Sequence, residues 1–148
     1  MKMTTSATEL DTQLVARLRL AVSRLARRLR QEAETGVSPS MLSALSSIER
    51  LGPCTLGELA AHERIQPPTL TRVVSRLHED GLVERIPDPT DRRIIRVQLS
   101  TQGKSFIQRV RTRKNAYLSR KLRGLDMDEL HAIETAVVAL ERLLEDES

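Results

Sequence analysis

The sequence predicts a mainly helical fold that carries one small β-hairpin. Three observations support this prediction. Apolar residues recur at three- and four-residue steps along most of the chain, which is the spacing of helices with one buried face. Only residues 82–86 and 94–99 form short β-prone runs. The chain has no Trp, one Tyr and one Phe, so its core must use Leu, Val, Ile and Ala, which suits packed helices.

Length and charge indicate a single unit, residues 1–148, with an uneven charge distribution. A chain of 148 residues fits one domain, and its net charge of +4 favours a polyanionic partner. Residues 17–30 hold six Arg and no acid, and residues 104–123 hold eight Lys or Arg and no acid. Residues 125–148 hold eight acids and only Arg142 as a base. This acidic end either turns away from the basic helices or pairs with them.

Targeting signals and cysteine usage indicate a cytoplasmic protein. The first residues lack the apolar core of a signal peptide, and no apolar run approaches the roughly 18 residues of a membrane span. Cys54 is the only cysteine, so an internal disulfide is excluded. We therefore expect no membrane partner, and we expect Cys54 to be packed and unreactive.

The two ends of the chain are expected to form long helices. An amphipathic helix is predicted over residues 9–34, with Gly36 ending it. A second long, basic helix begins at a cap on Ser100 or Thr101. The last helix carries a near-heptad apolar seam made of Leu130, Ile133, Val137, Leu140 and Leu144. A seam of this kind requires a partner helix.

Residues 38–100 are predicted to form a winged helix-turn-helix head. Ser38 and Pro39 begin one helix, and the spacing of residues 55–58 is that of a capping box that begins the next. Pro67 and Pro68 begin a further helix that ends at Gly81. Two helices joined by so short a turn are typical of a helix-turn-helix. The β-prone runs that follow, separated by a Pro- and Asp-rich turn, predict the wing.

The helix that begins at Pro67 has the residue pattern of a DNA recognition helix. Its apolar positions, predicted to face inward, are Leu70, Val73, Val74 and Leu77. Its outward positions are Pro68, Thr69, Thr71, Arg72, Ser75 and Arg76. Thr side chains reach phosphates or thymine methyls and Arg reads guanine, so Arg72 is the first candidate for base reading. The alternative is that these are solvated helix residues without a partner.

The predicted wing carries Arg92 and Arg93 at its tip, beside Asp91. A narrow minor groove attracts Arg through its concentrated negative potential, and Asp91 would orient one of the two arginines. An Asp-Arg-Arg turn on its own is also consistent with a local surface ion pair that contributes little.

Two segments carry a resemblance to a known family. PPTLTRVVSRLHEDGLVER (residues 67–85) and DPTDRRIIRVQLSTQG (residues 88–103) closely resemble MarR-type regulators, and the flanking helices agree in number and order. The resemblance implies a repressor that binds a pseudopalindromic double-stranded operator with residues 68–77 in the major groove and Asp91 and Arg93 in the wing. It also implies a homodimer formed by residues 9–34 and 104–146. The dimerisation residues would be Leu14, Leu18, Leu130, Ile133, Val137, Leu140 and Leu144.

The resemblance further implies release from DNA by a small anionic or phenolic ligand. Arg17, Arg24 and Arg28 are candidates to meet a carboxylate, but a basic helix face is also explained by solvation or by pairing with the acidic end. The ligand-binding residues therefore stay unassigned.

Other classes of function leave no trace in the sequence. There is no Gly-rich phosphate loop and no Ser, His and Asp set with a recognisable motif, so we expect no enzyme and no cofactor. His62, His78 and His131 are scattered over three elements, so no metal site is expected. Two alternatives stay open: a winged-helix module that binds another protein, and an architectural DNA binder indifferent to sequence. Salt dependence and sequence preference of DNA binding distinguish them.

Overall fold

A computed structural model describes residues 11–33 and 35–145, and it confirms the predicted fold class. The helices are α1 (Thr12–Ala33), α2 (Pro39–Leu51), α3 (Leu56–Glu63), α4 (Pro67–Glu79), α5 (Thr101–Leu122) and α6 (Met127–Glu145). The strands are β1 (Cys54–Thr55), β2 (Val83–Pro87) and β3 (Ile95–Leu99). The predicted helix ends at residues 9, 34 and 146 lie outside the described residues.

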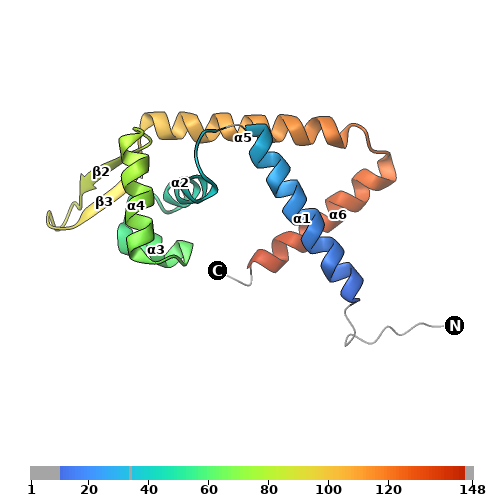
Figure 1. The fold of residues 1–148 in the computed structure, drawn as a ribbon, viewed down its shortest axis with the longest axis horizontal. Coiled ribbons are helices and arrows are strands. Elements are labelled where there is room, and N and C mark those ends of the chain that lie inside the picture. The colour runs from blue at the N-terminus through green and yellow to red at the C-terminus, as the bar shows by residue number, and fades with distance from the viewer. Residues whose placement is uncertain (1–10, 34, 146–148) are drawn as a thin grey trace.

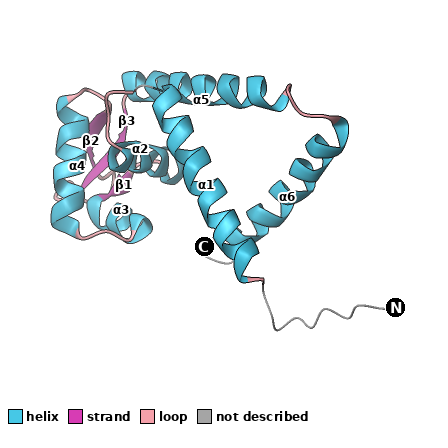
Figure 2. Ribbon diagram, turned by 45° about the vertical axis from the view of Figure 1, so that its right-hand side comes forward, coloured by secondary structure: helices cyan, strands magenta, loops and turns pink. Residues whose placement is uncertain are grey.

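The molecule divides into a head and an open frame of helices. The head consists of α2, α3, α4 and the three strands, and α5 runs from it as one long helix (Figure 1). Viewed from another side, α1, α5 and α6 outline a triangle in which α1 meets α5 partway along its length (Figure 2). The head therefore lies at one end of α5, and the turn to α6 lies at the other.

The sheet contains a strand that the sequence did not predict. Its order is β1-β3-β2, and all neighbours are antiparallel. β1 has only two residues, with Cys54 opposite Val97 and Thr55 opposite Arg96. β2 is shifted by one residue at both ends from the predicted 82–86, so it ends at Pro87, which lies opposite Ile95, and β3 begins one residue later than the predicted 94–99. Proline is tolerated there because the position ends an edge strand.

The helix starts form where the capping residues predicted them. The Ser38 hydroxyl accepts a hydrogen bond from the Met41 amide (3.3 Å), and Thr55 and Glu58 make both bonds of a capping box. These caps satisfy amide groups that have no partner inside the helix. The core beneath them is aliphatic and is built from Leu45, Ile48, Leu59, Leu70, Val74, Leu77 and Val97.

The junction between head and α5 is tightly packed. Ser100, rather than Thr101, is the cap of α5: its hydroxyl accepts from the Gly103 amide (3.0 Å) and donates to the Gly81 carbonyl (2.6 Å). A Cβ on Gly103 would lie 2.0 Å from the Leu82 carbonyl oxygen. The helix therefore begins at Thr101, as the predicted cap on Ser100 or Thr101 indicated, and its first turn lies directly against the backbone of the head.

Candidate nucleic-acid interface

Helix α4 presents one apolar and one polar face. Leu70, Val74 and Leu77 are fully buried and Val73 is partly buried, as the periodicity predicted. Five of the six predicted outward residues are exposed: Pro68, Thr69, Thr71, Arg72 and Arg76. Arg76 pairs with Asp80 at 3.3 Å. Within residues 11–33 and 35–145, no hydrogen bond or ion pair engages the Arg72 side chain, which leaves its guanidinium available to a partner.

Ser75 differs from the other predicted outward residues because it is half-buried. Its hydroxyl accepts a hydrogen bond from Nη2 of Arg85 on β2, at 3.3 Å. Sequence reasoning missed Arg85, because the periodicity of a strand does not reveal which helix the strand lies beside. The contact places a second guanidinium next to the polar face of α4.

The tip of the wing holds one oriented arginine. Nε of Arg93 lies 3.1 Å from Oδ1 of Asp91, and Nη2 lies 3.1 Å from Oδ2. The Arg93 side chain is nevertheless 90% exposed. These hydrogen bonds lower the pKa of Asp91, so the carboxylate stays ionised. Asp91 thus orients Arg93, whereas Arg92 is exposed beside it.

A buried carboxylate lies at the base of the wing, and the sequence interpretation did not single it out. Asp88 is 5% exposed, and its Oδ1 accepts from the Thr90 amide (2.8 Å), the Thr90 hydroxyl (2.7 Å) and the Asp91 amide (3.1 Å). Its Oδ2 accepts from Nε of Arg96. The Thr90 hydroxyl and the Arg96 guanidinium, followed by the two amides, hold the pKa of Asp88 well below its usual range. Asp88 therefore fixes the turn that presents Arg93.

The predicted dimerisation residues form exposed apolar stripes on α1 and α6. Leu14, Leu18, Ile133 and Val137 are exposed, and Leu144 is 68% exposed, while Leu130 and Leu140 are half-buried. No described residue of α6 is buried. An apolar seam of this extent without a covering element is typical of an interaction surface.

The basic helices and the acidic helix α6 do not pair within the described part of the chain. The acidic partners of the basic helices lie on α1 and α2 instead: Arg111 of α5 pairs with Glu49 of α2, and Arg28 and Arg120 approach Glu32 of α1. Glu134 of α6 pairs with neighbouring His131 only, among residues 11–33 and 35–145. The charges of α6 and of the basic helices are therefore not neutralised by one another among the described residues.

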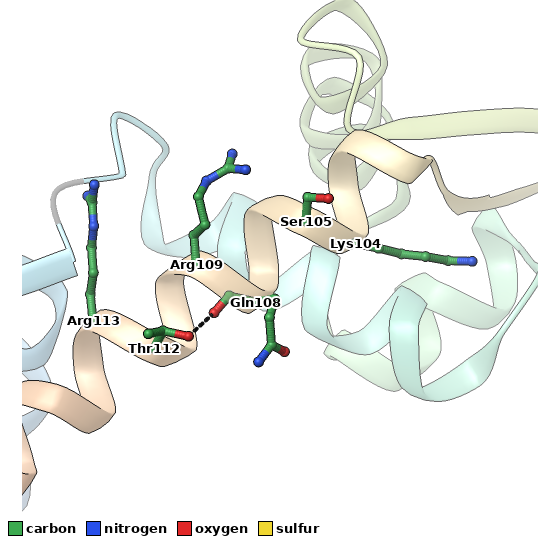
Figure 3. Close-up of a pocket in the computed structure, with 6 residues that line it drawn as sticks. All are labelled: Lys104, Ser105, Gln108, Arg109, Thr112 and Arg113. Carbon is green, nitrogen blue, oxygen red and sulfur yellow. Dashed lines mark hydrogen bonds between the residues drawn. The ribbon is translucent and has the colours of Figure 1, made fainter.

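An open surface hollow of about 560 Å³ lies along α5. It is lined by Lys104, Ser105, Gln108, Arg109, Thr112 and Arg113, all from one helix (Figure 3). Arg113 is anchored by a hydrogen bond from Nη1 to the Ala33 carbonyl (2.8 Å). Arg109 also lines the two neighbouring hollows, toward the end of α1 and toward the start of β2.

The described residues that could bind a metal ion or act as a reactive thiol are dispersed or buried. No group of three His, Cys, Asp or Glu side chains suited to a metal occurs among the described residues. Cys54 is buried in β1, as expected of a packed cysteine, and burial raises the pKa of its thiol. None of the described helices is both long and apolar enough to cross a membrane.

Comparison with known proteins assigns the chain to a family. A sequence model of the MarR family matches residues 37–95. An uncharacterized HTH-type transcriptional regulator of Mycobacterium leprae is 36% identical over 137 residues, which cover 92% of this chain and 96% of that protein. These relatives are regulators rather than enzymes, as expected from the sequence.

Two solved structures share the fold. A transcriptional regulator protein from Pseudomonas aeruginosa PA01 superimposes with a TM-score of 0.83 and 36% identity, covering 93% of this chain and 99% of the other. Streptococcus pneumoniae FabT, whose structure was solved in complex with DNA, has a TM-score of 0.71 at 17% identity, covering 93% and 100%. The sequence motifs, the winged head and these relatives agree, and the chain belongs to the MarR family of transcriptional regulators.

Proposed function

We propose that the protein is a repressor that reads double-stranded DNA with α4 in the major groove and the wing in the minor groove. The observation that carries this proposal is the exposed polar face of α4, Arg72 included, beside the oriented and exposed Arg93. Short polar and basic side chains on a helix whose other face is buried match the geometry of groove reading. FabT, which shares the fold, was solved in complex with DNA, and this supports DNA binding by the same fold.

The proposed active form is a homodimer on a pseudopalindromic operator. The exposed stripes on α1 and α6 would be covered by the second chain, and the basic α1 and acidic α6 are complementary in charge. Two-fold symmetry places the same patch on both chains and two heads on one duplex. The recognition helices would then lie one helical turn of DNA apart, about 34 Å.

Binding to DNA at several salt concentrations tests the proposal. The purified protein is titrated against a fragment from upstream of its own gene and against a random duplex of equal length. We expect specific binding that weakens steeply with salt, because phosphate contacts release counterions. Equal affinity for both duplexes would instead support an architectural role, and absence of binding to either would support a protein-binding module.

Replacing Arg72 is expected to reduce sequence discrimination. If Arg72 reads a base edge, Arg72→Ala lowers the preference for the operator over random DNA by about 1 to 3 kcal/mol. Competition binding with the two duplexes measures this difference. Arg123→Ala, which removes the same charge at the end of α5 away from the head, serves as the control. An equal loss on both duplexes would make Arg72 a phosphate contact.

Replacing Arg93 is expected to weaken binding to every sequence. Loss of a charge-assisted contact in the minor groove should raise the dissociation constant about tenfold on operator and random DNA alike. Arg93 lies far from α6, so Arg93→Ala should leave the dimer intact in sedimentation experiments. An unchanged affinity for both duplexes would show that the wing does not contribute to DNA binding.

The hollow along α5 supports a second proposal, that a small anionic or phenolic effector releases the repressor. Arg109 lines three adjoining hollows, and no hydrogen bond or ion pair engages its guanidinium among the described residues. Titration with a panel of aromatic carboxylates and phenols, read out by calorimetry and by release of DNA, tests this. Arg109→Ala should abolish the response while leaving DNA affinity unchanged, and a response that survives the substitution would place the effector elsewhere.

A further inference from the structure

Among the described residues, Arg96 is the one whose side chain contacts both the base of the wing and the start of α3. It lies on the central strand β3, opposite Ile86 of β2 and Thr55 of β1. Its Nε donates to the buried carboxylate of Asp88, and its Nη1 lies 3.3 Å from Oε2 of Glu58. Nη1 also reaches the Pro53 carbonyl at 3.4 Å. One guanidinium therefore contacts the wing turn, α3 and the segment before β1.

The two carboxylates that Arg96 joins each fix a different part of the head. Asp88 holds the turn that leads to Asp91 and Arg93. Oε2 of Glu58 accepts the Thr55 amide at 2.9 Å, and the Glu58 amide donates to the Thr55 hydroxyl at 3.1 Å. This capping box fixes the start of α3, the helix that packs beside α4. A continuous set of hydrogen bonds and ion pairs thus runs from the wing turn to the helix-turn-helix.

The geometry points to Arg96 as a positioning residue: we propose that it sets the wing turn relative to the recognition helix, so that the contribution of Arg93 to DNA binding depends on it. This inference rests on the proposed DNA-binding function. The Arg96 side chain is about one quarter exposed and faces two carboxylates, so a DNA phosphate is not its partner. Its effect on binding is therefore indirect, through the wing.

A double-mutant cycle between Arg93→Ala and Arg96→Met tests whether the contribution of Arg93 to DNA binding depends on Arg96. Binding is measured on a random duplex, because the expected effect of Arg93 is independent of sequence. Arg96→Met keeps most of the aliphatic stem and removes the guanidinium. We expect Arg96→Met alone to weaken binding about tenfold, like Arg93→Ala. The double variant should bind within about twofold of Arg93→Ala, because a misplaced wing has no arginine contact left to lose.

Arg85→Met is the matched control. Arg85 lies on the neighbouring strand, but its guanidinium donates to Ser75 on α4 and not to the wing turn. The fold-changes in dissociation constant caused by Arg85→Met and by Arg93→Ala should therefore multiply in the double variant. Arg96→Lys keeps one charge but not the fork that spans two carboxylates, so it should restore only part of the affinity.

A further variant separates positioning from folding. Arg96→Met alone leaves a buried carboxylate without its cation, whereas Asp88→Asn with Arg96→Met removes both charges together, which is far less disruptive. This paired variant should fold, and adding Arg93→Ala to it should not weaken DNA binding further. If either Arg96 variant lowers the melting temperature while Arg93→Ala keeps its full effect on binding, Arg96 is only structural and the inference is overturned. Failure of the wild-type protein to bind duplex DNA would instead overturn the proposed function, and this inference with it.

Discussion

Replacing Gly103 with alanine is expected to lower the free energy of unfolding by about 3 kcal/mol. The new Cβ would lie 2.0 Å from the Leu82 carbonyl oxygen and 3.0 Å from its carbon, so backbone rather than a flexible side chain must move. The same carbonyl accepts the Ser100 amide at 3.1 Å, so any shift also disturbs the cap of α5. Urea denaturation at one fixed protein concentration measures the loss.

Gly57 provides the matched control for this substitution. It lies near the start of α3, where a Cβ would meet only the Thr55 hydroxyl at 3.9 Å. Alanine is the better helix former, so Gly57→Ala should be neutral or should stabilise the protein by up to about 1 kcal/mol. A Gly103→Ala variant as stable as the wild type would show that α5 can shift freely against the head.

Replacing Leu140 and Leu144 together with glutamine is expected to dissociate the proposed dimer. By symmetry the change removes four leucine side chains from one interface, and each buried leucine contributes about 1.5 to 3 kcal/mol. The two residues are already partly covered or near the end of α6, so we expect the lower end of this range. At about 1.5 kcal/mol for each of the four leucines, the dissociation constant of the dimer should rise about 10,000-fold, as measured by sedimentation equilibrium.

Met127→Gln is the control for the seam substitutions. Met127 is 80% exposed at the first position of α6 and does not belong to the seam. Its replacement should leave the dimer unchanged, and both variants should keep their helical content. A Leu140 and Leu144 double variant that stays fully dimeric would contradict an interface built on this helix.

Local chemistry made the helices of the head predictable from the sequence. Ser38, the capping box at Thr55 and Pro67 act within one turn of the chain, so their roles follow from residue type and spacing. The buried positions of α4 follow from helical periodicity in the same way. The exposed stripes of α1 and α6 were visible as patterns, although one chain alone leaves them uncovered.

Features that depend on distant contacts were missed. β1 is too short to have a pattern of its own and exists because it pairs with β3, more than forty residues later. Arg96 and Glu58 are 38 positions apart, so nothing local connects them. Ser75 faces Arg85 rather than solvent because the wing folds back beside α4. These contacts follow from the topology and not from neighbouring residues.

The unbroken run of α5 makes it a lever between the frame and the head. With 22 residues it is about 33 Å long, and a helix of this kind resists bending. A tilt of about 10° where α5 turns into α6 displaces its other end by about 6 Å, and the head with it. In a symmetric dimer, two such helices would convert a small change in their crossing angle into a change in the distance between the two heads. Because the helical repeat of DNA is fixed, only some of these distances would allow both heads to bind one duplex.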